Sequence, residues 1–217
     1  MTENKEENAK NVKAISTNEE RALYAAEKIL SIVKEHFTVK TAVDFGCGTG
    51  LFLKYLKDNG TSVTGIDNDD KKLIGITKED FLQTDLTKPV HLGKKYDLSI
   101  TLEVAEHLPE SAAEIFISSL CEASNVVLFS AAVKGQGGVG HINEQFLSYW
   151  QKIFLKKNYF LLDIIRPEIW NDDIIPPYYR QNSVIFVNAD TYKNLPESIK
   201  TKNKIVDMIH PFYAKTK

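Results

Sequence analysis

The stretch Thr-Ala-Val-Asp-Phe-Gly-Cys-Gly-Thr-Gly at residues 41–50 constrains the fold more than any other part of the chain. Its apolar beginning predicts a buried strand, and the periodicity of residues 51–57 predicts a helix. Between them, Gly46, Gly48 and Gly50 require a tight turn. Because these positions carry no Cβ atoms, such a turn can bring backbone N–H groups and a helix N-terminus up to a ligand. The sequence therefore predicts a ligand-binding unit built from a strand, a turn and a helix.

The glycine spacing and the acid before it indicate the ligand. A nicotinamide-type G-x-G-x-x-G fingerprint would need a glycine where this chain has Leu51. The chain instead has G-x-G-x-G preceded by Asp44, which resembles the first motif of the class I S-adenosylmethionine (SAM) dependent methyltransferases. The resemblance covers residues 20–190. It implies that the cofactor SAM contacts the turn through Asp44, Gly46, Cys47, Gly48 and Gly50.

Further acids follow the next predicted strands. The strand at residues 62–66 ends in Asp67, about 20 residues beyond the glycines, where a carboxylate can accept both ribose hydroxyls. The resemblance implies that Asp85 receives the adenine amino group and that Leu86 packs on the ring. A fourth strand, residues 96–102, ends in Glu103, which resembles the fourth motif of the family and is expected to face the cofactor.

The order of elements predicts the fold class. Strands and helices alternate over residues 41–133, which predicts a parallel sheet with helices on both faces. The resemblance implies a Rossmann-like α/β methyltransferase fold with seven strands, the final pair antiparallel. Residues 159–165 and 183–187 are the expected final pair. The segment 68–80 is short for a crossover helix, so the adenine side of the cofactor site is expected to be open.

A second group of residues points to chemistry near the fourth strand. Glu103, Glu106 and His107 with the distant His141 give the pattern E-x-x-E-H followed by H. It resembles the metal site of small-RNA 2'-O-methyltransferases, and E-x-x-E-H also resembles ubiquinone-biosynthesis O-methyltransferases. The resemblance implies that these four residues hold a divalent cation such as Mn, Mg or Zn. Three interpretations stay open: catalysis by Glu106, His107 and His141 around a metal, a metal-free histidine base, or no catalytic role for the histidines.

Residues 166–182 form a long connection rich in aromatic residues and prolines, as expected of a substrate lid or pocket wall. Trp170 and Tyr178 are candidates for stacking on a sugar or base, and Arg180 is a candidate clamp for an anionic substrate. A surface ion pair is the favoured role for Arg166. Tyr24, in the helix predicted to begin after Asn18, is a candidate for folding over the bound ligands, and the favoured alternative is that it packs under the N-terminal arm.

Composition bounds the remaining possibilities. With 217 residues and 43% hydrophobic content, one domain is expected, flanked by a flexible arm (1–19) and a solvated basic tail (191–217). The net charge of −2 argues against a nucleic-acid surface. No apolar run is long enough to span a membrane. Cys47 and Cys121 form no metal or redox spacing, so a cytoplasmic location is expected. Either a monomer or a homodimer is compatible with the sequence.

These observations predict SAM-dependent methyl transfer to an oxygen of a small polar acceptor. The expected acceptor is a sugar or phosphorylated metabolite, because the stretch from His141 to Asn182 resembles methyltransferases that accompany bacterial surface-polysaccharide genes. Two alternatives remain. One is a 2'-O-methyltransferase that acts on an RNA terminus, and the other is a SAM-binding protein without catalysis.

Overall fold

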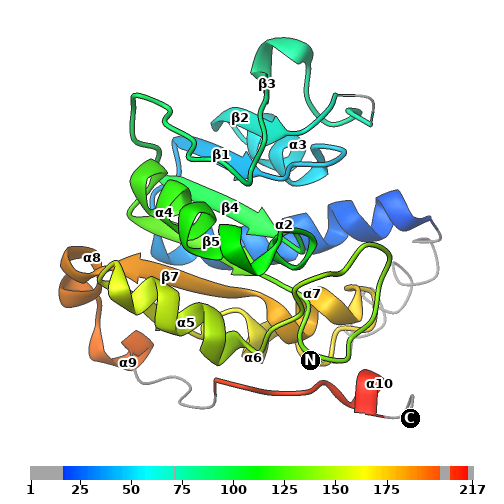
Figure 1. Ribbon diagram of the computed structural model, residues 1–217, viewed down its shortest axis with the longest axis vertical. Helices are drawn as coiled ribbons and strands as arrows, with labels where there is room; N and C mark the ends of the chain where they lie inside the picture. The colour runs from blue at the N-terminus through cyan, green and yellow to red at the C-terminus, as the bar shows by residue number, and fades with distance from the viewer. Residues whose placement is uncertain (1–16, 71, 201–205, 215–217) are drawn as a thin grey trace, which may run out of the picture.

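A seven-stranded sheet in the order β3-β2-β1-β4-β5-β7-β6 organises the chain (Figure 1). The computed structural model describes residues 17–70, 72–200 and 206–214. Neighbouring strands are parallel except that β7 runs antiparallel to both β5 and β6. The predicted Rossmann-like sheet is thus confirmed. Its strands are β1 (Thr41–Phe45), β2 (Ser62–Asp67), β3 (Phe81–Gln83), β4 (Leu98–Leu102), β5 (Val126–Ser130), β6 (Tyr159–Leu162) and β7 (Val184–Asn188).

The central strands are buried on both faces, because successive side chains enter two separate cores. On one face, Ala42 and Leu128 pack with α2 (Asn18–His36) and α3 (Leu51–Asp58). On the other, Val43 and Phe129 pack with α4 (Ala113–Ala123) and α5 (Leu147–Lys156). Figure 1 shows these helices as layers around the sheet. The expectation of helices on both faces is therefore confirmed.

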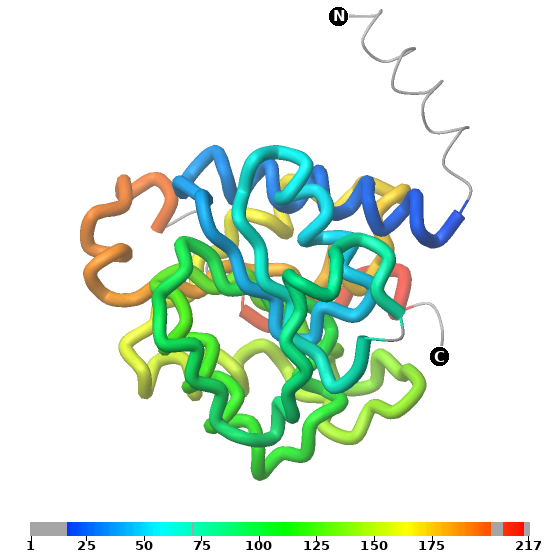
Figure 2. Tube along the Cα trace, turned by 90° about the horizontal axis from the view of Figure 1, so that it is seen from above, coloured from blue at the N-terminus to red at the C-terminus, as the bar shows by residue number. Residues whose placement is uncertain are grey.

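Helix α2 begins where the sequence predicts, at Asn18. Thr17 and Glu20 form a capping box: Thr17 Oγ1 accepts a hydrogen bond from Glu20 N, and Glu20 Oε2 accepts one from Thr17 N. The expected flexible arm lies mostly outside the described residues. Seen from above, α2 runs beside the yellow segment around residue 175 (Figure 2), where Arg21 Nη2 donates to Asp173 O at 3.0 Å.

The segment between β2 and β3 contains no crossover helix among its described residues, as its length predicts. It forms one short 3-10 helix, η1 (Lys78–Asp80), and folds back onto the glycine turn. The backbone N–H groups of Ile74 and Gly75 both donate to Thr49 O, at 3.0 and 2.9 Å. The turn is thus supported by the chain that follows β2.

The expectation of a solvated tail is wrong for residues 206–210. Arg166 Nη1 donates to Val206 O at 3.0 Å, and His210 N donates to Gln181 Oε1 at 2.7 Å. Figure 1 shows this red segment beneath α6 (Arg166–Ile169) and α7 (Pro177–Asn182). Backbone groups of the tail thus satisfy the buried side chains of Arg166 and Gln181, which holds the segment against α6 and α7.

The remaining elements are short. They are η2 (Ala105–His107), η3 (Glu110–Ala112), α8 (Ala189–Asn194), α9 (Glu197–Lys200) and α10 (Pro211–Ala214).

No described helix has both the length and the apolar character needed to cross a membrane.

Candidate active site

The glycine turn between β1 and α3 has a backbone that other residues would strain. Gly46, Gly48 and Gly50 have φ angles of 85°, 52° and 77°. A Cβ atom on Gly46 would lie 2.4 Å from a methyl group of Val104, whereas one on Gly48 would meet no atom within 4 Å. The turn is therefore closed on the side of β4 and open at Gly48, where a ligand can approach the backbone.

Asp67 at the end of β2 is tied to this turn. Its Oδ2 atom accepts a hydrogen bond from Gly48 N at 2.8 Å, and its Oδ1 atom accepts one from Asn68 N at 2.7 Å. These bonds hold the carboxylate at the carboxyl edge of the sheet, where open α/β folds bind ligands. Asp67 is placed where the sequence predicts a ribose-binding acid.

Two cavities meet beside the turn, and Gly46 and Glu103 line both of them. The turn cavity, about 320 Å³, is formed by the glycine turn, the start of α3 and the aromatic residues of α7. The acid cavity, about 570 Å³, lies beside the ends of β2 and β3. Its lining includes Asp67, Asn68, Lys72, Asp85, Leu86, Val104, His107 and Leu108.

The cofactor residues predicted from sequence are distributed between these cavities. Asp44 and Cys47 line the turn cavity, and burial raises the pKa of the Cys47 thiol, which keeps it neutral. Asp85 Oδ1 accepts hydrogen bonds from both the N–H and the hydroxyl of Thr87, and these bonds lower the pKa of Asp85. Gly50 lies at the N-cap of α3 and lines neither cavity.

Asp44 is a buried carboxyl beside a second acid. Burial, and then the charge of Asp67, raise the pKa of Asp44 to about 8. An unfolded Asp titrates near about 4, so the folded state binds more protons than the unfolded state between about pH 4 and 8. Stability therefore falls as pH rises through this window.

We expect the free energy of unfolding of the Asp44→Asn variant to depend less on pH than that of the wild type. The difference in slope should reach at most about 1.4 kcal/mol per pH unit for this one group. Urea unfolding at pH 5, 6, 7 and 8 measures it. Parallel curves for the two proteins would show that Asp44 titrates normally.

Glu103, directly after β4, has an unusual backbone and a fixed side chain. Its φ of 56° lies in the left-handed region, which non-glycine residues seldom adopt. Oε2 accepts a hydrogen bond from Gln136 Nε2 and Oε1 accepts one from Asn182 Nδ2, both at 3.0 Å. The pKa of Glu103 is raised by burial, although these hydrogen bonds oppose the shift.

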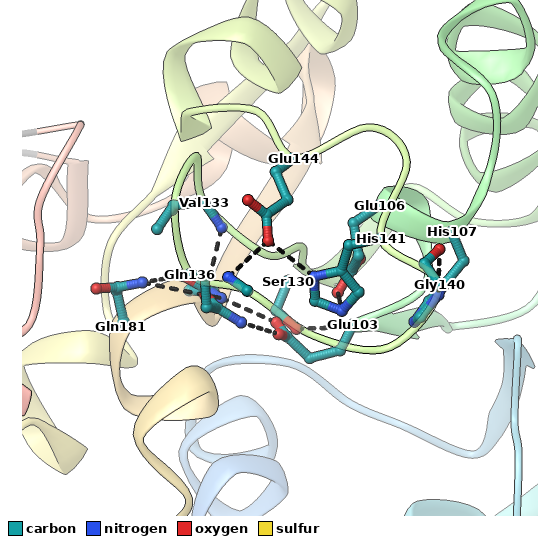
Figure 3. Close-up of polar contacts among 12 residues, drawn as sticks. Glu103, Glu106, His107, Ser130, Val133, Gln136, Gly140, His141, Glu144 and Gln181 are labelled. Atoms are coloured by element: carbon teal, nitrogen blue, oxygen red, sulfur yellow. Dashed lines mark hydrogen bonds and ion pairs between the residues drawn. The ribbon is translucent and has the colours of Figure 1, made fainter. Parts of the chain in front are cut away.

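Glu106, His107 and His141 form one cluster (Figure 3). One ligand atom from each lies within 4.8 Å of the others, and Glu103 is not part of this group. The carboxylate of Glu106 is fully buried. Its Oε1 lies 4.0 Å from His141 Nε2, and neither of its oxygens has a hydrogen-bond partner among the described residues. Burial, with the charge of Glu103, raises the pKa of Glu106 to about 8. Such a carboxylate beside two imidazoles fits a cation site.

Glu144 fixes the loop that carries His141 (Figure 3). It accepts hydrogen bonds from Gly135 N at 2.9 Å and Gly137 N at 2.8 Å, and it lies 2.9 Å from His141 Nδ1. Burial raises the pKa of Glu144, but these hydrogen bonds outweigh it and the pKa is lowered. On the other side of the cluster, His107 Nδ1 lies 3.1 Å from Gly140 O.

Of the substrate residues predicted from sequence, Tyr178 lines the turn cavity and the other three do not. The hydroxyl of Tyr24 donates to Asp172, and Trp170 packs against the ring of His210. Arg180 is buried and its Nη1 lies 2.6 Å from the exposed carboxylate of Asp173, while its Nε has no hydrogen-bond partner among the described residues. Arg166 forms the expected ion pair, with Asp163, but it is buried.

Sequence reasoning missed four residues of the site: Tyr179, Gln136, Asn182 and Glu144. Tyr179 lines the turn cavity beside Tyr178 and contacts Phe52 edge to face. Only Glu144 carried a signal, because it stands three residues after His141 and near the glycines that it binds. The carboxamide residues Gln136 and Asn182 could not have been identified from the sequence, because their partner Glu103 is distant in sequence.

Comparisons with known proteins agree with this geometry. A family model described as a methyltransferase domain matches residues 17–151. A ubiquinone biosynthesis O-methyltransferase of Marinobacter nauticus is 38% identical over 35% of this chain and 37% of that protein. The chain spans less than half the length of the curated relatives it matches.

Two solved structures share the fold. The magnesium protoporphyrin IX methyltransferase of Synechocystis has a TM-score of 0.56 at 19% identity, covering 78% of this chain and 84% of that one. The small RNA methyltransferase HEN1 has a TM-score of 0.59 at 18% identity, covering 81% of this chain and 26% of that one. At these identities the likeness concerns the fold.

Proposed function

The chain belongs to the methyltransferase domain family, and we propose that it transfers the methyl group of SAM to an oxygen atom of a small polar acceptor. The observation that carries this proposal is that His107 lines the acid cavity together with Asp67 and Asp85. A residue that could act on the acceptor therefore lies beside the proposed cofactor site. Bound SAM supplies a methyl group on a sulfonium for in-line displacement. The protein must align the acceptor, exclude water and handle its proton.

The residues of the two cavities suit the parts of SAM. Asp67 is fixed by Gly48 N and is assigned to the ribose hydroxyls. Asp85, with Oδ1 held by Thr87, keeps Oδ2 for the adenine amino group, and the buried side chain of Leu86 lies beside it. The turn cavity, walled by Tyr178 and Tyr179, is assigned to the methionine part.

A divalent cation fits the cluster of Glu106, His107 and His141. Support comes from the buried Glu106 carboxylate, which has no hydrogen-bond partner in the described part of the chain, and from the two imidazoles beside it. Mixed nitrogen and oxygen ligands suit Mn, Fe or Zn better than Mg. Such a cation would lower the pKa of an acceptor hydroxyl and fix its position. Without a cation, His107 or His141 would serve as the general base, and activity would survive a chelator.

The acceptor is proposed to be a polyhydroxylated molecule such as a sugar, with bacterial surface polysaccharide as its context. The ion pair of Arg180 with Asp173 weakens the argument for a phosphorylated acceptor, although Arg180 Nε has no hydrogen-bond partner among the described residues. The curated relatives are ubiquinone biosynthesis enzymes that also methylate oxygen, which supports an oxygen acceptor.

A second candidate is methylation of an RNA terminus. It is favoured by the cluster of Glu106, His107 and His141, and by the shared fold of a small RNA methyltransferase. The net charge of −2 argues against it. Nanomolar, salt-sensitive binding of a short RNA would favour it over a sugar. A third candidate, a SAM-binding protein without catalysis, would bind SAM but never produce S-adenosylhomocysteine (SAH).

Calorimetric titration with SAM tests the proposal directly. It is run on chelator-stripped protein and again after Mn is restored, with elemental analysis of the protein as purified. We expect micromolar SAM affinity in both cases and one bound metal per chain. Absence of SAM binding would overturn the proposed function. Full activity in a chelator would overturn the proposal that a metal takes part in catalysis.

We also expect the Glu144→Ala variant to bind Mn about 10–100-fold more weakly than the wild type. Glu144 orients His141 through Nδ1 and holds the loop at Gly135 and Gly137, so its loss frees the ligand. The matched control is Glu122→Ala. Glu122 also contacts a histidine, the exposed His91, at 2.8 Å, but this pair is not part of the cluster. Equal Mn affinity in both variants would show that Glu144 does not position His141.

A further inference from the structure

Glu103 occupies a special place because it lines both cavities of the proposed cofactor site. Its backbone N–H donates to Ser130 O at 3.1 Å and to Ser130 Oγ at 3.0 Å, which anchors the left-handed turn after β4. Strained residues of this kind persist where surrounding structure holds them, often at ligand sites. The turn directs the side chain of Glu103 to the junction of the two cavities.

Two carboxamides, here called the carboxamide clamp (Gln136 and Asn182), fix the Glu103 carboxylate. Figure 3 shows the contact of Gln136 with Glu103. The orientation of Gln136 is set by its Oε1 atom, which accepts hydrogen bonds from three donors. These donors are Asn182 Nδ2 at 2.9 Å, Gln181 Nε2 at 3.2 Å and Val133 N at 3.3 Å. Since Oε1 is occupied, Nε2 must face Glu103.

The clamp supplies hydrogen bonds but no charge. None of the ion pairs among the described residues includes Glu103. Tyr178 lines the turn cavity together with Glu103, and its pKa is raised by burial and by the charge of Glu103. A carboxylate held by neutral amides in a buried site is stabilised by a cationic ligand group.

We propose that Glu103 is not a metal ligand but the receptor for the positive charge of the cofactor, aimed by the carboxamide clamp. This inference rests on the proposed function. The junction of the two cavities separates the adenosine part of the site from the methionine part, which is where the sulfonium of SAM joins its two halves. SAH carries no sulfonium charge, so Glu103 favours the substrate form of the cofactor over the product form.

The experiment compares two matched substitutions, Glu103→Gln and Glu106→Gln, by titration with SAM, with SAH and with Mn²⁺. For Glu103→Gln, we expect SAM affinity to fall at least tenfold, SAH affinity to fall less than threefold, and Mn²⁺ affinity to stay within twofold. For Glu106→Gln, we expect the reverse: Mn²⁺ affinity is lost and SAM affinity is kept. Loss of Mn²⁺ affinity in Glu103→Gln, or an equal loss of SAM and SAH affinity, would overturn the proposal.

A second pair of variants guards against misfolding of Glu103→Gln. Gln136→Met removes one arm of the clamp, and Gln145→Met is its control, because Gln145 donates to Asn143 in the same loop. We expect only Gln136→Met to weaken SAM, by about three- to tenfold, with SAH unchanged. Equal SAM affinity in these two variants would overturn the role of the clamp. A wild type that binds neither SAM nor SAH would instead overturn the proposed function itself.

Discussion

Replacing His141 with alanine is expected to lower methyl transfer more than about 100-fold while changing SAM affinity less than twofold. The substitution removes one of two imidazoles from the cluster and leaves Glu106, already without hydrogen-bond partners among the described residues, facing an empty space. The cofactor residues are untouched, since His141 lines neither cavity. Transfer of a radiolabelled methyl group and calorimetry with SAM measure the two quantities separately.

The control for this variant is His91→Ala, which removes an exposed imidazole that also lies beside a glutamate. It should leave both quantities unchanged. Two further outcomes divide the mechanisms. If His141→Ala is inactive and a chelator has no effect on the wild type, His141 acts as a base without a metal. If His141→Ala is fully active, the cluster has no role in catalysis.

The Gly75→Ala variant is expected to be less stable by about 2–3 kcal/mol, a fall in melting temperature of roughly 5–10 °C. A Cβ atom on Gly75 would lie 2.2 Å from Gly50 O and 2.9 Å from Leu51 N. These are backbone atoms at the start of α3, so the clash cannot be relieved by a side-chain rotation. The glycine turn must shift, and SAM affinity should fall with it.

Thermal melting with and without SAM checks this result. Gly93→Ala is the control, because Gly93 has a φ of 67° but no atom within 4 Å of an added Cβ. The Gly93→Ala variant should lose only about 1 kcal/mol of stability, from the strain of a left-handed alanine, and its SAM affinity should stay unchanged. A Gly75→Ala protein that melts and binds SAM like the wild type would show that the turn tolerates displacement.

The fold and the positions of the acids proposed to bind the cofactor were predictable because they follow local rules. Strands buried on both faces have continuous apolar sequences, as in β5. Glycines occupy the positive-φ positions of the turn between β1 and α3. The position of Asp67 follows from the carboxyl end of β2. For such features, residue type and spacing are sufficient.

The chemistry of the two glutamates was not predictable, because it depends on partners distant in sequence. The pattern E-x-x-E-H treats Glu103 and Glu106 alike, yet the first is bound by Gln136 and Asn182 and the second has no described hydrogen-bond partner. The left-handed φ of Glu103 is a backbone difference between these two glutamates. Arg180 was assigned to an anion for the same reason, since its pairing with Asp173 has no sequence signature.

The docked segment 206–210 has a practical consequence for work with this protein. The composition suggests that a minimal domain could stop at residue 190, where the Lys-rich stretch begins. Such a shortened protein would lose the backbone group of His210 that holds Gln181, and Gln181 in turn holds Gln136 of the clamp. It would also remove one hydrogen-bond acceptor of Arg166, the backbone oxygen of Val206. A boundary chosen from composition would therefore cut into the support of the cofactor site, so expression should retain the chain through residue 214.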